Sequence, residues 1–376
     1  MKKAVCISCT HHYQERTAPV EATLRAAGYE CTYITSDYNH YTKSHYRVTD
    51  MPHCQQIPTL AYKRNISVQR ILSHMRFARD AFARVEQLQP DLVYVELPPN
   101  SLCAAAARYK KRHPEVKVIF DLFDLWPESF PDRRLKALFL IFFRIWGNMR
   151  NKNLSKGDLV LTECDLYRQK LAHYLKNVRH RTLYLCQSHA TTTAAKCLPE
   201  QDALHLCYLG YINNLIDIPT ISALLGHLQA LRPVVLHIIG DGETRDAFIS
   251  AAESVGVKTE FYGKVYDPAQ KQAIFDKCSF GLNIMKDSVC VGLTLKSMDY
   301  FGGALPILNS IEADTWDLVE SRGVGINIDR ADLAATAAKI AAITPAQQQA
   351  MGEKTLQMFE ELFTEAVFQK TLLSVL

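Results

Sequence analysis

The chain has 376 residues, of which 48% are hydrophobic and 22% are charged, a composition that excludes a disordered or fibrous protein. This length exceeds what one hydrophobic core normally fills, so two domains are predicted. No segment reaches the roughly 20 consecutive apolar residues of a membrane-spanning helix, and the N-terminal residues contain no apolar signal region. We therefore expect a cytoplasmic protein whose 11 cysteines are reduced, because disulfides are rare in that compartment.

Charge is distributed unevenly along the chain. Residues 1–190 hold 29 basic and 17 acidic side chains, a net charge of +12, and the remainder holds 14 basic and 22 acidic ones, a net charge of −8. The basic half is therefore expected to meet an anionic partner. No nucleic-acid-binding motif accompanies this charge, so nucleic acid is not an expected partner. An anionic membrane surface or a phosphate-linked acceptor fits at least as well.

Short apolar runs of strand length alternate with helix-length segments, which is the pattern of parallel α/β domains. In the first half, strands are expected at 4–8, 30–34, 91–95, 116–120, 158–162 and 182–185. A Tyr- and His-rich connection, 37–62, separates the second strand from the third. Connections of that length are usually functional or mobile.

The strand pattern stops at a polar stretch and restarts beyond it, with strands expected at 205–209, 234–239, 258–262, 280–284 and 306–308. The predicted organisation is an N-terminal Rossmann-like domain (1–190), a linker (191–203), a second Rossmann-like domain (204–355) and a C-terminal helix (356–376). This last helix is expected to pack back toward the N-terminal domain. Two doubly wound domains in tandem are expected to bind a ligand in a cleft at the carboxyl ends of both sheets.

Four segments carry recognisable motifs. Residues 239–243, Ile-Gly-Asp-Gly-Glu, resemble the G-[DS]-G turn of family 4 glycosyltransferases. Residues 261–265, Phe-Tyr-Gly-Lys-Val, resemble the next strand-to-loop step of that family, where the nucleotide base is held. Residues 292–307 resemble its nucleotide-sugar signature, a loop and helix that bear a ribose-binding acid. Residues 121–129, Asp-Leu-Phe-Asp-Leu-Trp-Pro-Glu-Ser, are similar to a segment of members that build surface polysaccharides.

The resemblance implies the GT-B fold, two doubly wound Rossmann-like domains that face a cleft. It also implies a glycosyltransferase that moves a sugar from a nucleotide-diphosphate sugar, with UDP as the expected nucleotide, to a surface-glycan or lipid-linked acceptor. Retention of the anomeric configuration and independence from a metal cofactor are further implications. In this family the leaving phosphate is thought to take the proton of the acceptor hydroxyl, so that no dedicated protein base is required.

The donor-binding residues are carried over from the matching motifs. A helix that begins near Thr294 would direct its positive end toward a diphosphate, and Asp299 would accept hydrogen bonds from the ribose, a solvated helix surface being the alternative. Gly240 and Gly242 would let the backbone approach the donor without a Cβ in the way. The other donor-binding candidates are Gly210, Tyr211, Asn213, Asn214, Asp241, Tyr262, Val265 and Leu295. Ordinary loop chemistry is the alternative for the tyrosine and asparagines near 211–214.

The chain departs from the family pattern at three positions. Family members place an arginine and a lysine on the donor phosphates where this chain has Tyr211 and Ile216, and a sugar-binding glutamate where it has Val291. Lys296, at the start of the signature helix, is a candidate to supply part of the missing charge, an exposed helix lysine being the alternative. The departures also support a second hypothesis, a catalytically silent glycosyltransferase-like subunit that binds an active partner.

The first half supplies the acceptor-binding candidates, which are His11, His12, Asp121, Trp126 and Glu128. Asp124 is the candidate to orient the acceptor hydroxyl, and N-capping of the following turn is the alternative. Together with Lys296 and Asp299 it forms the predicted catalytic set.

Bulky apolar residues fall all round the segment 133–153, with basic residues at both ends. The segment is interpreted either as a helix that lies among lipid headgroups or as a buried helix flanked by surface charge. The basic first half favours membrane contact at the inner face of the plasma membrane. In that case Phe142 and Phe143 are expected to contact lipid.

Overall fold

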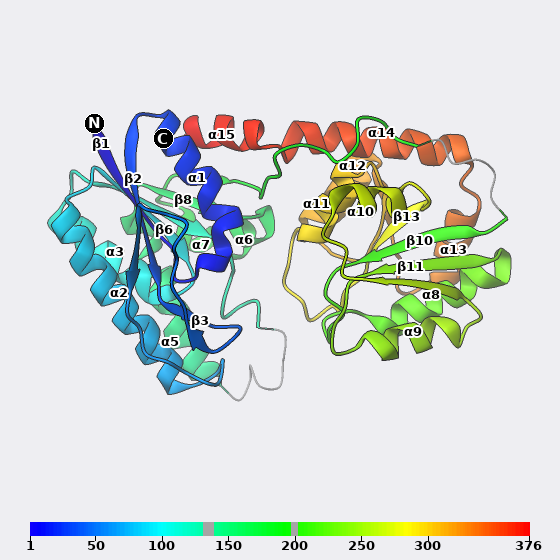
Figure 1. The fold of residues 1–376 in the computed structure, drawn as a ribbon, viewed down its shortest axis with the longest axis horizontal. Helices are drawn as coiled ribbons and strands as arrows, with labels where there is room; N and C mark the ends of the chain where they lie inside the picture. The colour runs from blue at the N-terminus through cyan, green and yellow to red at the C-terminus, as the bar shows by residue number, and fades with distance from the viewer. Residues whose placement is uncertain (131–138, 197–201) are drawn as a thin grey trace. The chain divides into compact units, whose positions relative to one another are not determined.

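The computed structural model describes residues 1–130, 139–196 and 202–376, which form two compact units. Met1–Cys186 and Phe368–Leu376 make up the first unit, and Gln187–Val367 make up the second. Each unit is built on a parallel β-sheet of its own (Figure 1).

The first unit contains a seven-stranded sheet with the strand order β5-β2-β1-β6-β7-β8-β9. Its strands are β1 (Lys2–Ile7), β2 (Tyr29–Ser36), β5 (Cys54–Ile57), β6 (Leu92–Leu97), β7 (Lys117–Leu122), β8 (Leu159–Thr162) and β9 (His180–Thr182). All neighbouring pairs are parallel. The order reverses between β1 and β6, and the carboxyl ends of strands at such a point are the usual place for a ligand in a doubly wound sheet.

Helices cover both faces of this sheet. They are α1 (Gln14–Ala26), α2 (Val68–Leu88), α3 (Asn100–Arg112), α5 (Leu140–Asn151), α6 (Asp165–Lys170), α7 (Ala172–Leu175) and α15 (Glu365–Leu373). In Figure 1, α1 lies on one side of the sheet and α2 and α3 lie on the other. Phe368 and Leu372 of α15 are buried in the same core cluster as Val20 and Leu24 of α1. Because both faces are covered, all six residues of β6 are buried, as is usual for a central parallel strand.

The second unit contains a six-stranded parallel sheet with the order β12-β11-β10-β13-β14-β15. Its strands are β10 (Leu204–Leu209), β11 (Val234–Ile239), β12 (Lys258–Gly263), β13 (Phe280–Asn283), β14 (Ile307–Asn309) and β15 (Gly325–Asn327). Its helices are α8 (Ile218–Leu231), α9 (Arg245–Glu253), α10 (Pro268–Phe275), α11 (Leu295–Gly302), α12 (Asp314–Arg322), α13 (Leu333–Ala341) and α14 (Pro345–Leu362). The order reverses between β10 and β13, so the loops after these strands mark the expected ligand-binding edge.

The predicted α/β class with two doubly wound parallel sheets is confirmed. Two local predictions were wrong. The connection 37–62 holds the sheet strand β5 and a small hairpin of β3 (Tyr38–Asn39) and β4 (Ser44–His45). The last strand of the first sheet was expected at 182–185, but it is β9 at His180–Thr182, because these residues pair with β8. The apolar residues that suggested a strand follow the paired segment.

Of the segment 133–153, the structure describes residues 139–153, and 133–138 lie outside the described residues. α5 buries Phe143 and Trp146, each 4% exposed, on one side. Its other side leaves Leu140, Ile141 and Ile145 at 60%, 77% and 62% exposure. Lipid contact by Phe143 does not fit this burial, because the ring packs edge-on against Trp126 at a centroid distance of 5.4 Å. Within the described ranges, no helix is long and apolar enough to cross a membrane.

Candidate functional site

At the edge of the second sheet where a ligand is expected to bind, the loops after β10 and β11 are hydrogen-bonded to each other. The Gly210 N–H donates to the Ile239 carbonyl at 2.9 Å, and the Ile212 N–H donates to the Asp241 carbonyl at 2.9 Å. A Cβ on Gly240 would lie 1.9 Å from the Gly210 carbonyl oxygen. A Cβ on Gly242 would likewise lie 2.2 Å from the Ile212 carbonyl oxygen. The two glycines of the G-D-G turn are thus required for the loops to pack together, which adds a structural reason to the predicted ligand approach.

Helix α11 starts at this same edge. It begins after Thr294 because the Thr294 hydroxyl caps it by accepting a hydrogen bond from the Ser297 N–H at 3.2 Å. The hydroxyl also donates to Asn283 Oδ1 at 3.1 Å, which anchors the helix start to the end of β13. The positive end of the α11 dipole therefore lies beside the strand-order reversal, where it can interact with an anion.

Lys296 lies in the first turn of α11, next to the loop after β10. Its Cδ would contact a Cβ on Gly210 at 3.9 Å, and its Nζ is 5.1 Å from the centroid of the Tyr208 ring. Burial lowers the pKa of this lysine to about 8, because desolvation disfavours the ammonium form. Among the described residues no carboxylate pairs with it, and desolvation is the one cause of its pKa shift. The alternative of an ordinary exposed lysine does not fit this setting.

Asp299 lies one turn further along α11. Its Oδ1 accepts hydrogen bonds from Lys271 Nζ at 2.6 Å and from Gln187 Nε2 at 3.3 Å. Its side chain is 26% exposed, so it is neither buried nor on a fully solvated surface. Both of these contacts use Oδ1, so that within the described residues Oδ2 is available to a ligand hydroxyl. The sequence reasoning missed Lys271, which reaches this carboxylate from α10.

The remaining donor candidates are only partly brought together. Tyr211 is 62% exposed, and its hydrogen bond with the Glu243 carboxylate raises the pKa of the Tyr211 hydroxyl. Asn213 Oδ1 accepts the Leu215 N–H at 3.0 Å, as an ordinary turn asparagine does. Of the others, Asp241 pairs with a neighbouring arginine, Asn214 and Leu295 are exposed, and Val265 is half-buried after β12.

Tyr262 was expected to contact the nucleotide base at the edge of the sheet, but its side chain is engaged by other residues of the sheet. Its hydroxyl donates to Glu260 at 2.8 Å and is 2.9 Å from His237 Nδ1. Its ring also stacks on the His237 ring at a centroid distance of 5.8 Å. The side chain is thus held along the face of the sheet by residues of its own and the neighbouring strand.

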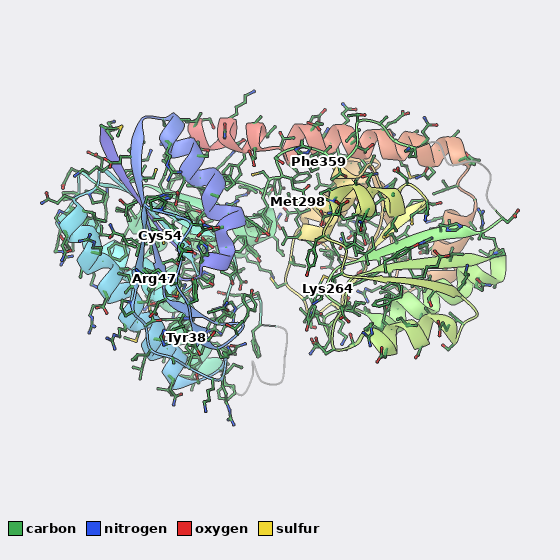
Figure 2. The ribbon with its side chains drawn as sticks, viewed as in Figure 1. Tyr38, Arg47, Cys54, Lys264, Met298 and Phe359 are labelled. Atoms are coloured by element: carbon green, nitrogen blue, oxygen red, sulfur yellow. The ribbon has the colours of Figure 1, made fainter. Side chains whose placement is uncertain are left out.

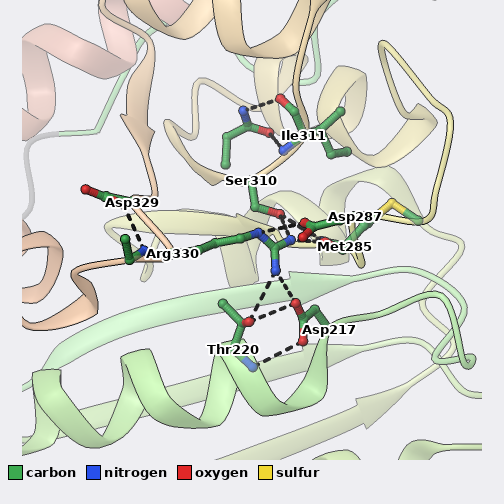
Figure 3. A network of polar contacts seen from close by, with 10 residues as sticks. Asp217, Thr220, Met285, Asp287, Ser310, Ile311, Asp329 and Arg330 are labelled. Carbon is green, nitrogen blue, oxygen red and sulfur yellow. Dashed lines mark hydrogen bonds and ion pairs between the residues drawn. The ribbon is translucent and has the colours of Figure 1, made fainter.

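Arg330 is a second cation near this edge that the sequence reasoning missed. Its guanidinium pairs with Asp217 and, at 3.0 Å, with Asp287. It also donates to the Met285 carbonyl and, at 3.2 Å, to the Ser310 hydroxyl (Figure 3). Two carboxylates thus compensate its charge. Through these contacts Arg330 joins the loops after β13 and β14 to the start of α8. It does not replace the phosphate-binding arginine that family members have.

In the first unit, Asp121 is buried in β7 and is fully engaged. Its Oδ2 and Oδ1 accept hydrogen bonds from Arg16 Nε at 2.7 Å and Arg16 Nη2 at 2.8 Å, and the Tyr94 hydroxyl donates to it as well. The side chains of Asp121 and Arg16 have 0% exposure. The predicted contact of Asp121 with an acceptor is therefore wrong, because a carboxylate without exposed surface cannot reach a ligand.

Arg150 of α5 holds the segment that follows β7. Its Nη2 pairs with Glu128 at 2.6 Å, and its Nη1 donates to the Trp126 carbonyl at 3.0 Å. Glu128 thus serves the packing of this segment, although 32% of its side chain is exposed. His11 packs near the Tyr33 and Tyr46 rings, and the side chain of His12 lies outside the described part of the structure.

Asp124 and the Trp126 side chain line a cavity near the carboxyl ends of β1 and β6. The Ser129 hydroxyl donates to Asp124 Oδ1 at 2.7 Å. Burial raises the pKa of the Asp124 carboxyl, against the opposing effects of Ser129 and of the Arg150 and Arg70 charges. A carboxyl with a raised pKa in a cavity is a candidate to orient or exchange a proton with a ligand hydroxyl.

Comparison with known proteins identifies the fold. No protein-family profile matches the sequence, and no curated protein matches it. Sucrose-phosphate synthase from Thermosynechococcus elongatus aligns with a TM-score of 0.73 at 14% identity, over 100% of this chain and 98% of that one. HepE from Anabaena, in complex with UDP, gives 0.67 at 11% identity, over 100% and 99%. The lipopolysaccharide outer core galactosyltransferase WaaB gives 0.66 at 12% identity, over 100% and 99%.

The chain therefore has the GT-B fold, which confirms the fold that the motifs implied. At these identities the likeness concerns the fold alone. Membership of family 4 stays a prediction.

Proposed function

We propose that this protein is a glycosyltransferase that binds a nucleotide-diphosphate sugar at the edge formed by β10, β13 and α11. The observation that carries the proposal is Lys296, a half-buried lysine with no carboxylate partner among the described residues, beside the positive end of α11. A diphosphate is the ligand group that both features would bind. UDP is the nucleotide we propose, since HepE, which shares the fold, is described in complex with UDP.

The same edge offers a place for the ribose. Asp299 has one oxygen engaged by Lys271 and Gln187 and the other available, so it can accept a hydrogen bond from a ribose hydroxyl. We propose that Lys271 holds the carboxylate in place. The positive charge from Lys296 and from α11 takes the role of the missing arginine, and the proposed reaction uses no metal cofactor.

In the proposed reaction, the bond between the anomeric carbon and the oxygen of the donor β-phosphate breaks. A bond from the same carbon to the acceptor oxygen forms on the same face, so that the configuration is retained. The acceptor proton passes to the leaving phosphate, and Asp124 orients the acceptor hydroxyl. The acceptor is a surface glycan or a lipid-linked sugar.

A silent subunit that binds an active glycosyltransferase is the second candidate. It is favoured by Tyr211, Ile216 and Val291, which stand where family members have two phosphate cations and a sugar-binding acid. Such a protein would keep the nucleotide site and lose the transfer step.

One experiment separates these functions. The melting temperature of the purified protein is measured with UDP, GDP, ADP and TDP in turn. Hydrolysis of UDP-sugars by the protein is then followed over hours. We expect UDP to raise the melting temperature, by mass action on the folded state, and slow hydrolysis to release free sugar. Lys296→Met should abolish the shift, whereas Lys339→Met, an exposed lysine of α13, should preserve it. Stabilisation without any turnover supports the silent subunit, and no stabilisation by any nucleotide contradicts both functions.

We also propose that the first unit docks on an anionic membrane. Exposed apolar side chains on α5 (Leu140, Ile141 and Ile145) accompany the net charge of +12 in residues 1–190. A helix that presents apolar residues beside basic ones is suited to the headgroup region of such a surface.

A further inference from the structure

Two cavities in the first unit adjoin each other, since Tyr13, Arg70, His74 and Pro98 line both of them. We call the pair the N-unit pocket. It lies at the carboxyl ends of β1 and β6, where the strand order reverses. Tyr38, which is labelled in Figure 2, belongs to its wall. This is the position at which a doubly wound unit usually binds its ligand.

The two halves of the N-unit pocket differ in chemistry. The first half has many hydroxyl groups in its wall, from Thr10, Ser36, Tyr38, Thr59, Tyr62 and Ser73. The second half is mostly aromatic and aliphatic, with Ile66, Ile71, Trp126, Phe142 and Trp146. Arg70 lines both halves. A ligand that fills the pocket therefore meets hydroxyl groups, then a positive charge, then an apolar wall.

Arg70 differs from the buried arginines of the same unit in having no carboxylate partner among the described residues. Arg16 is paired with Asp121, and Arg150 is paired with Glu128. By contrast, Arg70 donates from Nη1 to the Asn65 carbonyl at 2.9 Å and is hydrogen-bonded to the Tyr62 side chain, while its buried Nε finds no acceptor within the described part of the chain. An arginine charge in a pocket with a donor left over is expected to bind an anionic group.

The surroundings of Arg70 strengthen this expectation. Its Cζ is 5.9 Å from the centroids of both the Tyr62 and the Trp126 rings, so both rings attract the guanidinium through cation–π interactions. Lys43 adds a second cation, with Nζ 5.0 Å from the Tyr62 centroid. Arg70 also lies in the first turn of α2, whose positive end adds to the attraction for an anion.

Two titratable groups of the pocket lie near Arg70, an imidazole and a carboxyl. Burial and the Arg70 charge lower the pKa of His74 well below its usual value, so this imidazole is neutral at pH 7. Asp124 is the carboxyl group that lines the second half of the pocket. Burial raises the pKa of the Asp124 carboxyl, so this group is suited to orient a ligand hydroxyl or to exchange a proton with it.

We propose that the N-unit pocket binds an acceptor built of a sugar, a phosphate and an apolar chain, in that order. The hydroxyl-rich half receives the sugar, Arg70 binds the phosphate, and Trp126, Phe142 and Trp146 pack against the start of the apolar chain. This inference rests on the proposed glycosyl transfer, because only a transferase has an acceptor. Of the two acceptor classes proposed above, a surface glycan and a lipid-linked sugar, it selects the second, with a phosphate as the link.

Calorimetry with three simple probes tests the proposal on the full chain, with each probe kept below its micelle concentration. Decyl phosphate carries the chain and the phosphate, octyl glucoside carries a sugar and a chain without charge, and inorganic phosphate carries the charge alone. We expect decyl phosphate to bind at least about tenfold more tightly than either of the others, because only it can use both Arg70 and the apolar wall. Equal affinities for all three probes would overturn the proposal.

Variants at Arg70 show which group makes the contact. Arg70→Gln should weaken decyl phosphate binding about tenfold or more, and Arg70→Lys, which keeps the charge, should recover part of it. Arg79→Gln is the matched control, since Arg79 lies on the same helix with its side chain 72% exposed, and it should bind as the unchanged protein does. An unchanged affinity in Arg70→Gln overturns the assignment.

A readout on the unchanged protein covers the case in which an Arg70 variant does not fold. Decyl phosphate with a photoreactive diazirine at the end of its chain is expected to label the segment around Trp126 or α5. Labelling confined to other parts of the chain overturns the proposal. UDP binding, measured on the same samples, separates the two hypotheses: UDP binding without decyl phosphate binding rejects only the pocket assignment, and the reverse result rejects only the proposed donor site.

Discussion

Single residues decide the chemistry of the donor edge, and Lys296 offers the sharpest test. Burial lowers the pKa of its ammonium group to about 8. The protonated form is the one that attracts a diphosphate, so binding raises the pKa again, and affinity must fall as pH rises above it. We expect UDP to bind progressively more weakly between about pH 7 and pH 8.5, while the affinity for uridine, whose base does not titrate in this range, stays constant.

Titration calorimetry with UDP and uridine at several pH values checks this expectation. In Lys296→Met the affinity for UDP should be low and nearly independent of pH over the same range. A parallel loss for UDP and uridine would show that the lysine does not touch phosphate.

Asp299 gives the second test at this scale. Asp299→Ala removes a charged hydrogen-bond acceptor, which typically costs about 1.5–3 kcal/mol of binding free energy. Lys271→Met should have a smaller effect on UDP affinity, since it removes the group that holds the carboxylate and leaves the acceptor itself. Calorimetry with UDP on both variants measures the difference, and a normal affinity in Asp299→Ala would remove the aspartate from the site.

The sequence could indicate single residues but not their partners. Lys296 and Asp299 were found because they lie in a motif of continuous sequence. The pair Lys271–Asp299 joins residues 28 positions apart, and Arg330–Asp217 joins residues 113 positions apart, so no local pattern announces either. The prediction that Asp121 contacts an acceptor failed for the same reason, because the arginine that pairs with it is 105 positions away.

At the scale of secondary-structure elements, Arg16 joins α1 to β7 and to the residues after β9. Its guanidinium contacts the Asp121 carboxylate and the Leu183 and Tyr184 carbonyls, and it lies 5.5 Å from the Phe368 ring of α15. Asp121→Asn leaves a buried arginine without its counter-charge. We expect the free energy of unfolding to fall by about 3–5 kcal/mol.

Urea unfolding measures this loss. Asp80→Asn on α2 is the control, because its ion pairs are exposed and such pairs contribute about 0–1 kcal/mol. A stable Asp121→Asn protein with weakened acceptor binding would restore the original acceptor assignment.

Elements with a strong apolar pattern could be predicted, and those that depend on the edge of a sheet could not. The central strands β1, β6 and β11 are nearly or wholly buried, and their apolar runs stand out in the sequence. β5 was missed because Cys-Gln-Gln-Ile is only half-buried. Its place in the sheet comes from parallel pairing with β2, which neither its composition nor its position in a long connection reveals.

At the scale of the whole molecule, the alternation of strands and helices on either side of a polar stretch predicts two doubly wound domains, and the motif resemblance implied their GT-B fold. The acceptor could not be predicted in the same way, since the N-unit pocket combines side chains from residue 9 to residue 146. Charge, by contrast, is visible in the sequence, and the contrast between +12 in residues 1–190 and −8 in the remainder motivates the last prediction.

We expect the protein to sediment with anionic vesicles and not with neutral ones. Each basic residue near such a surface contributes about 1 kcal/mol, and the attraction decays over a Debye length of about 8–10 Å at physiological salt, so binding should fall as salt rises. The exposed side chains of α5 identify the substitutions to make. Ile141→Ser combined with Ile145→Ser should weaken sedimentation without lowering the melting temperature, because both side chains are more than half exposed, at 77% and 62%.

Phe143→Ser is the contrasting variant. Its ring is 4% exposed, so the substitution should lower stability by about 3–5 kcal/mol, as deletion of a buried aromatic side chain does. Melting curves recorded beside the sedimentation assay separate loss of folding from loss of membrane contact. If the unchanged protein stays in solution with anionic vesicles at low salt, the membrane proposal fails.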